Sequence, residues 1–99
     1  MNLSASDLLI LQQYFTRIPV KKAYLFGSRA RNEARPESDI DLLLELDHSQ
    51  PIGMTFFLYK TDLEALLHKK IDLITTGSIS RHLKPFIEKD KILIYERVD

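Results

Sequence analysis

Two aspartates one residue apart are the side chains in this sequence best suited to chemistry. Asp39 and Asp41 flank Ile40 at the start of an apolar run that ends at Leu46. On a β-strand, alternate side chains point to the same face, so the two carboxylates would lie side by side. Two like charges in contact raise each other's pKa unless a cation lies between them. The pair therefore predicts a divalent-cation site, and its oxygen ligands favour Mg²⁺, with Mn²⁺ as the second choice.

A third carboxylate, Asp72, lies in another short apolar run, directly after Ile71. If the two strands are neighbours, Asp72 can face Asp39 and Asp41. Three carboxylates can hold two metal ions about 3.5–4 Å apart, an arrangement used for in-line phosphoryl and nucleotidyl transfer. A simpler explanation stays open: Asp39 and Asp72 would be turn residues, and Asp41 would be solvated at the start of a strand.

The dipeptide Gly27-Ser28 follows the apolar run 20–26 and precedes a short segment that can form a helical turn. Glycine allows the backbone to approach a ligand closely, and the free N–H groups at the start of a helix favour anions. Arg29 and Arg31 follow and could neutralise a phosphate. The alternatives are that Ser28 is an ordinary helix N-cap and that the arginines pair with nearby glutamates.

Apolar periodicity predicts helices that alternate with strands, which is typical of an α/β domain with helices around a small sheet. The run 40–46 is almost continuously apolar, so we expect a central strand with both faces covered. We predict one domain over residues 1–99. Its expected helices span 4–17, 28–34, 53–70 and 80–89, and its expected strands span 20–26, 40–46, 71–75 and 91–97, the last at an edge.

Helical spacing also predicts which side chains of the two later helices face inward. In the 53–70 helix these are Phe56, Tyr59, Leu63, Leu66 and Leu67. In the 80–89 helix they are Leu83, Phe86 and Ile87, and Pro85 should kink that helix or confine it to its later part. Phe57 and Leu58 are surplus apolar residues and indicate a protein-contact surface.

Composition excludes several classes of partner. The 99 residues carry 14 basic and 14 acidic side chains, so no overall positive field favours nucleic acid or a membrane surface. No apolar run is long enough to span a bilayer, the N-terminus lacks the features of a secretory signal, and there is no cysteine. We expect a cytoplasmic location. His48, His68 and His82 have no metal-binding spacing and are interpreted as structural or solvated.

The joint pattern is more specific than its parts. A predicted strand, Gly27-Ser28, ten further residues and then Asp39-Ile40-Asp41 on the next strand resemble the minimal nucleotidyltransferases of the DNA polymerase beta-like superfamily. The stretch Ile71-Asp72-Leu73-Ile74 matches the place of that family's third carboxylate. One departure is Asn32, where the family often has glycine. Asparagine tolerates a left-handed backbone, so we expect this loop to keep its shape.

The resemblance implies a palm-like nucleotidyltransferase fold with a small mixed β-sheet flanked by helices. It also implies a site that uses ATP and Mg²⁺, with two metal ions. In that site the metal ligands would be Asp39, Asp41 and Asp72, with Asp72 also acting as a base near the nucleophile. The triphosphate contacts would be Gly27 and Ser28, to which we add Arg29 and Arg31 as expected nucleotide-binding residues.

The resemblance further implies transfer of AMP from ATP to a tyrosine hydroxyl of an all-helical HEPN-type toxin, so that the chain would act as an antitoxin. Two alternatives stay open. One is a non-catalytic antitoxin, a binding module that neutralises a helical partner by forming a complex. The other is transfer to a small molecule or an RNA end, which the lack of excess positive charge and of a second domain disfavours.

Overall fold

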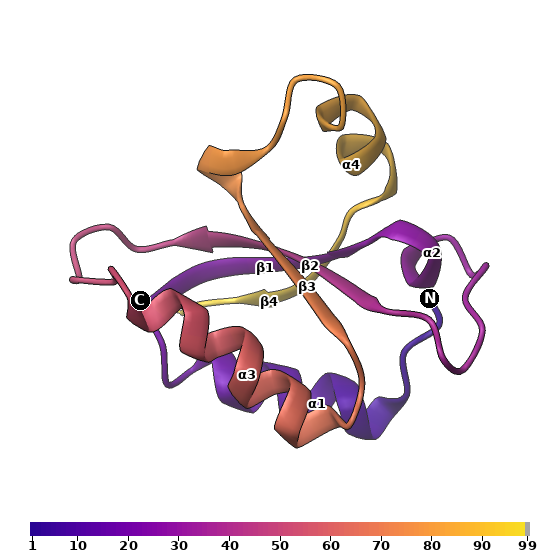
Figure 1. The fold of residues 1–99 in the computed structure, drawn as a ribbon, viewed down its shortest axis with the longest axis horizontal. Coiled ribbons are helices and arrows are strands. Elements are labelled where there is room, and N and C mark those ends of the chain that lie inside the picture. Colours follow the sequence, from indigo (N-terminus) through magenta and orange to yellow (C-terminus); the bar gives the residue numbers. More distant parts are fainter. Residues whose placement is uncertain (99) are drawn as a thin grey trace.

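One four-stranded mixed sheet organises the computed structural model, which describes residues 1–98 (Figure 1). Its strands lie in the spatial order β3-β2-β1-β4. β1 is antiparallel to both of its neighbours, whereas β2 and β3 are parallel. The mixed sheet, the central place of β2 and the edge place of β4 are as predicted. The strands are β1 (Val20–Phe26), β2 (Ile40–Leu46), β3 (Ile71–Thr75) and β4 (Ile92–Glu96).

Two helices, α1 (Ala5–Phe15) and α3 (Thr55–Leu67), cover one face of this sheet and enclose the hydrophobic core (Figure 1). α1 begins where the Ser4 side chain accepts a hydrogen bond from the Asp7 N–H group at 3.0 Å, as expected for an N-cap. α3 ends at His68, which has the left-handed backbone common at helix ends. The helices contribute Leu11, Tyr14, Phe15, Tyr59, Leu63 and Leu67 to the core.

β2 anchors the core because its side chains alternate between two covered faces. Ile40, Leu42 and Leu44 are fully buried on the side of α1 and α3. Leu43 points to the opposite face and is also buried. Asp41 shares the face of Leu43, so the same alternation that places the apolar residues in the core places this carboxylate on the other side of the sheet.

That other side is covered only in part, by α2 (Gly27–Ala30) and α4 (Lys84–Asp90), with a short 3₁₀ turn at Thr76–Ser78 after β3. In Figure 1, α4 lies on the opposite side of the sheet from α1 and α3. The sheet face between α2 and α4, which carries Asp41 and Asp72, is called the open face below.

Three predicted inward residues are exposed instead. Pro85 lies in the first turn of α4 and delays the helix to Lys84, so the helix is short and only Ile87 is buried. Leu83 is 49% exposed and Phe86 is 66% exposed, which corrects their predicted inward orientation. Leu66 of α3 is exposed as well, because the buried stripe of that helix is narrower than predicted.

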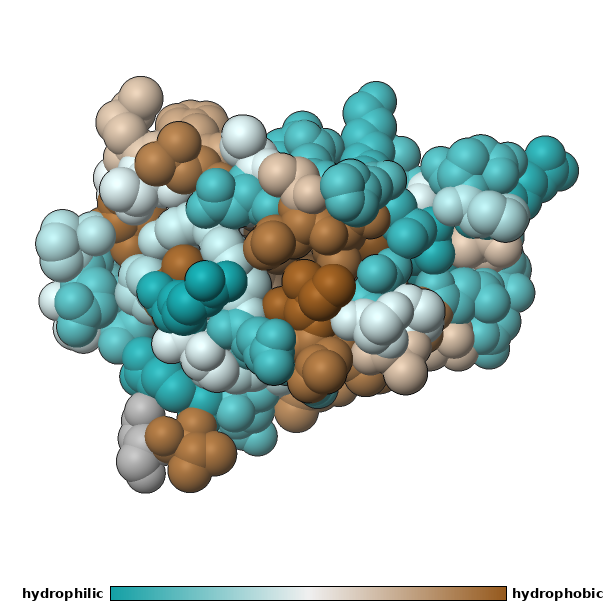
Figure 2. All heavy atoms as spheres, turned by 90° about the horizontal axis from the view of Figure 1, so that it is seen from below, coloured by the Kyte–Doolittle hydropathy of each residue, from teal (hydrophilic) through white to brown (hydrophobic). Residues whose placement is uncertain are grey.

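The outer surface of α1 and α3 also carries apolar side chains, which gather near the middle of the face shown in Figure 2. Exposed residues of these helices include Leu9, Phe57, Leu58 and Leu66. Over residues 1–98, each helix is too short or too polar to cross a lipid bilayer.

Candidate functional site

Asp41 and Asp72 face each other across the β2–β3 pair. The two strands are parallel, and in their register Asp41 lies opposite Asp72. On its other side, Asp41 lies opposite Phe26, the last residue of β1, which leads directly into Gly27. Because β1 ends where β2 and β3 begin, the topology brings Gly27-Ser28 and the two carboxylates to one corner of the open face.

Gly27 is a glycine because the Asp41 carboxylate lies against its backbone. A Cβ atom added at Gly27 would lie 2.1 Å from Asp41 Oδ2 and 3.1 Å from Asp41 Cγ. Gly27 also has φ +75°, a conformation that L side chains rarely adopt. The local backbone and the position of the carboxylate therefore both require glycine here.

The carboxyl group of Asp41 is held in an unfavourable electrostatic environment. Its pKa is raised to about 6, first by burial and then by the charges of Asp72 and Asp39. The charges of Arg31 and Arg29 oppose this rise only in part. Asp39 and Asp72 therefore both lie close enough to Asp41 for their charges to disfavour its ionised form.

The three aspartates also differ from other acids of the chain in what they contact. Asp7, Asp47 and Asp90 each form an ion pair at 2.8 Å or less. By contrast, within residues 1–98 the carboxylates of Asp39, Asp41 and Asp72 have no hydrogen bond or ion pair. Asp39 lies in the loop before β2 and is exposed, which also fits the simpler explanation of a solvated turn residue, whereas Asp72 lies within β3 rather than in a turn.

The predicted metal ligands Asp39, Asp41 and Asp72 are brought together but do not form a finished metal site. Among the described residues, no three His, Cys, Asp or Glu side chains are arranged to enclose a metal ion. The physical reason is that Asp39 lies in the loop before β2 and is exposed, as is Asp72, while Asp41 leans over Gly27. The side chains still fit a metal ion chemically, because carboxylate oxygens are the ligands that a hard divalent cation such as Mg²⁺ prefers.

Ser28 lies inside the first turn of α2 rather than at its cap. The N-cap position is Phe26, and no side chain caps this helix. The N-cap explanation for Ser28 is therefore wrong, and its hydroxyl has no hydrogen-bond partner in the part of the chain that the structure describes. Asn32 has φ 61°, which confirms the expected left-handed backbone at this position.

Arg29 has a structural role that the sequence did not reveal. Its side chain is 6% exposed, and its guanidinium donates hydrogen bonds to the carbonyl oxygens of Asn2 at 2.9 Å and Ser38 at 2.7 Å. It also donates to those of Pro36 at 3.1 Å and Asp39 at 3.3 Å. Arg29 therefore holds the loop that carries Asp39, and its predicted nucleotide contact would have to compete with these bonds.

Arg31 lies at the end of α2 and connects it to α4. Its guanidinium pairs with Glu33 at 3.0 Å, which confirms the alternative that this arginine pairs with a nearby glutamate, and it also pairs with Asp90 at 2.6 Å. Asp90 was missed by sequence reasoning because it is 59 residues away and nothing near it marks it as a partner. Arg31 remains a predicted phosphate ligand, and the ion pair fixes α4 beside the candidate site.

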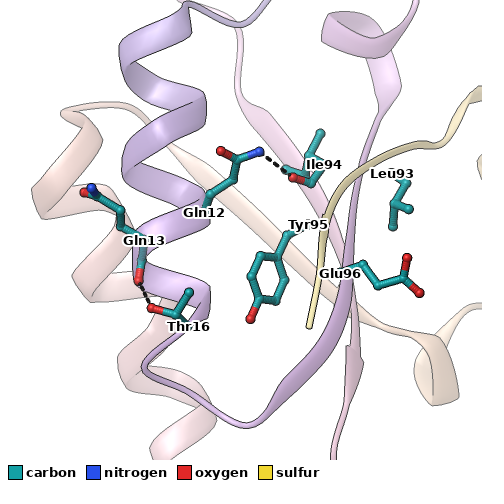
Figure 3. Close-up of a pocket in the computed structure, with 7 residues that line it drawn as sticks. All are labelled: Gln12, Gln13, Thr16, Leu93, Ile94, Tyr95 and Glu96. Carbon is teal, nitrogen blue, oxygen red and sulfur yellow. Dashed lines mark hydrogen bonds between the residues drawn. The ribbon is translucent and has the colours of Figure 1, made fainter. Parts of the chain in front are cut away.

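The hollow between α1 and β4, of about 480 Å³, lies away from the carboxylates (Figure 3). Gln12 closes part of it by donating a hydrogen bond to the Ile94 carbonyl at 2.9 Å. Since β4 and β3 lie at opposite edges of the sheet and Asp72 is on β3, we do not assign chemistry to this hollow. It is lined by Gln12, Gln13, Thr16, Leu93, Ile94, Tyr95 and Glu96.

Replacing Gly27 by alanine should destabilise the fold more than the same change at Gly53. Both glycines have positive φ, so both changes carry a backbone cost of about 1–2 kcal/mol. Only at Gly27 would the new Cβ also collide with Asp41, since nothing lies within 4 Å of the Cβ position at Gly53. Urea unfolding of the two variants measures the difference. Equal losses of stability would contradict the close approach of Asp41.

Replacing Asp41 by asparagine should stabilise the metal-free protein above pH 7. Because the folded-state pKa of Asp41 is about 6 and the unfolded value is near 3.9, the charged form costs stability as pH rises through that window. The gain should be about 1–2 kcal/mol after allowance for partial exposure, and should disappear near pH 4. Thermal unfolding in chelator between pH 4 and 8 measures it, with Glu37→Gln as the control. A variant less stable than wild type at pH 8 would contradict the electrostatic account.

Comparison with known proteins agrees with this geometry. The family "Polymerase beta, Nucleotidyltransferase" matches residues 10–99. A Methanocaldococcus jannaschii protein, named as a candidate protein adenylyltransferase, is 41% identical over 76 residues, which are 76% of this chain and 76% of the relative. Protein adenylyltransferase MntA of Thermococcus cleftensis is 28% identical over 78 residues, which are 79% of this chain and 78% of MntA.

Two solved toxin–antitoxin complexes share the fold. A complex with AMP-PNP matches with a TM-score of 0.72 at 19% identity, covering 95% of this chain and 75% of the other. A complex of tri-AMPylated Shewanella oneidensis HEPN toxin with MNT antitoxin matches with a TM-score of 0.62 at 16% identity, covering 91% and 73%. Because the family model matches residues 10–99 and a relative is 41% identical over 76% of the chain, the chain belongs to the polymerase beta nucleotidyltransferase family and is a nucleotidyltransferase.

Proposed function

We propose that this chain transfers AMP from ATP to a tyrosine hydroxyl of a HEPN-type toxin and so acts as its antitoxin. The observation that carries the proposal is the position of Asp39 and Asp72 near Asp41, whose carboxylate lies against Gly27. Within residues 1–98 none of these three carboxylates has a hydrogen-bond or ion-pair partner. The names of similar proteins support it: one relative is a protein adenylyltransferase, and one complex of the same fold contains an AMPylated HEPN toxin.

The triphosphate would bind at the start of α2. Gly27 has no side chain to obstruct a phosphate, the first N–H groups of the helix face outward, and the Ser28 hydroxyl is available to donate. Arg31, at the end of the same helix, would have to exchange its ion pairs with Glu33 and Asp90 for a phosphate oxygen. Arg29 would act indirectly, by holding the loop that positions Asp39.

The acceptor would approach from the side of β3. Its hydroxyl oxygen forms the new bond to the α-phosphorus of ATP, the bond from that phosphorus to the bridging oxygen breaks, and pyrophosphate leaves. Asp72 is exposed on the open face and would accept the hydroxyl proton. Asp39, Asp41 and Asp72 would hold Mg²⁺, which when bound lowers the pKa of the attacking hydroxyl and neutralises the triphosphate.

The decisive experiment follows label from α-labelled ATP onto a purified HEPN-type partner in the presence of Mg²⁺. Wild-type protein should label a tyrosine of the partner, and Asp39→Asn/Asp41→Asn should reduce the rate by at least about a thousandfold, because the charges that organise the reacting groups are lost. Glu37→Gln, an exposed acid of the same loop, should retain full activity. Full labelling by a folded double variant would contradict the proposal.

A second candidate function is neutralisation by binding alone. The apolar side chains exposed on α1 and α3 favour it, because such a patch suits a helical protein partner (Figure 2). The same double variant separates the two functions. If Asp39→Asn/Asp41→Asn still neutralises the toxin in a growth assay while labelling is lost, occlusion is the better account.

A further inference from the structure

A second hollow lies on the side of the sheet where the acceptor would approach. It has a volume of about 310 Å³ and is lined mainly by apolar side chains of β3, α3 and the segment before α4. Ile74 lies in its wall and two residues from Asp72 on the same strand, so both point to the open face. Leu73 and Phe56 in the same wall belong to the side of α1 and α3, so the hollow lies at the β3 edge of the sheet, beyond Asp72, which does not line it. Its lining residues are Phe56, Leu73, Ile74, Thr75, Ser78, Ser80 and Leu83.

Residues of α4 continue this apolar surface across the open face. Leu83, Phe86 and Asp90 are spaced three and four residues apart, which places them on one side of the helix. Leu83 lines the hollow at the β3 edge, and Asp90 pairs with Arg31 beside the carboxylates. Phe86 lies between them along the chain and is 66% exposed, so a large aromatic ring is left uncovered on this side of α4.

Several positively charged side chains lie in α4 and in the segment just before it. Of the acids in α4, Glu88 pairs with Lys91 and Asp90 pairs with Arg31. Arg81, Lys84 and Lys89 are exposed and form no ion pair within the described part of the chain. The α4 side of the apolar surface thus carries unpaired positive charge, called the positive rim below, whereas the unpaired carboxylates of Asp39, Asp41 and Asp72 lie at the other end of the open face.

We propose that this surface docks the protein substrate, by binding an acidic and apolar segment that carries the acceptor hydroxyl. The inference rests on the proposed function and adds the chemistry of the segment that the site selects. Leucine-like or aromatic side chains of the segment fill the hollow and cover Phe86, and its carboxylates pair with Arg81 and Lys84. Contact with Ile74 and Leu83 sets the segment beside Asp72, where the hydroxyl reacts.

The arrangement favours a protein segment over the nucleotide at this place. The triphosphate contacts at Gly27-Ser28 lie at the end of β1, whereas the hollow lies beyond Asp72 along β3 and has mostly apolar walls. Covering Leu83 and Phe86 gives a hydrophobic contribution that a triphosphate cannot supply. The positive rim then discriminates among apolar segments by charge.

Binding of synthetic peptides to the full chain tests this docking without requiring any transfer. The probe is a fluorescein-labelled peptide in which one tyrosine is flanked by leucines and glutamates, measured by fluorescence anisotropy. Matched peptides carry lysines in place of the glutamates, or serines in place of the leucines. The first peptide should bind at least about tenfold more tightly than either control, since both charge and apolar contact contribute.

Variants locate the binding surface. Leu83→Ser, Phe86→Ser and Lys84→Glu should each weaken binding of the acidic peptide by about tenfold. Leu93→Ser is the matched apolar control, because Leu93 is 47% exposed against 49% for Leu83 and lies on β4 at the opposite edge of the sheet. Lys21→Glu is the control for charge reversal at an exposed lysine. Binding of a fluorescent ATP analogue should be unchanged in all of these variants.

Several results would overturn the inference. The wild-type chain could fail to bind the acidic peptide, or all variants could bind it equally. The variants could weaken binding of the ATP analogue and leave peptide binding unchanged. The chain could also bind a labelled oligoadenylate RNA in preference to the peptide. Failure of the proposed function is distinct. If the acidic peptide binds through Leu83, Phe86 and Lys84 but no HEPN-type partner accepts AMP, the docking surface is supported and the proposed HEPN-type substrate is contradicted.

Discussion

Repulsion among Asp39, Asp41 and Asp72 is the constraint on which the rest of this structure depends. The three carboxylates meet where β2 and β3 begin, and Asp41 is half-buried with a pKa of about 6. Such an arrangement costs stability in the isolated fold, so it persists only because neighbouring elements hold it in place. Under the proposed function, the same repulsion would favour a divalent cation at this corner, because a cation would neutralise the carboxylates.

The elements around the corner hold it by different means. Alternation along β2 fixes Asp41, because Ile40 and Leu42 on either side are fully buried in the core. Arg29 fixes Asp39 by binding carbonyl oxygens of the preceding loop, and Gly27 leaves room for Asp41. The small α/β scaffold therefore has its rigid core on one face of the sheet and the candidate site on the other face.

Sequence patterns predicted the strands well, because the features that define a strand are local in the sequence. The runs 20–26, 40–46 and 71–75 are bounded by turn residues and match the observed strands. The contacts that sequence patterns did not predict depend on the tertiary fold. The partners of Arg29 are backbone carbonyls, which have no sequence signature, and Asp90 is too distant in the chain to be linked to Arg31. Phe86 is exposed because Pro85 shortens α4, leaving one buried position, Ile87.

Titration of the wild-type chain and of Asp41→Asn with Mn²⁺, followed by electron paramagnetic resonance of the free ion, tests the central claim most directly. If the carboxylates are clustered to receive a divalent cation, the wild-type chain should bind Mn²⁺ saturably at pH 7.5, and Mg²⁺ should compete. The variant should bind at least about tenfold more weakly, because one ligand and its charge are lost. Equal binding by both chains, or none by the wild type, would contradict this account of the site.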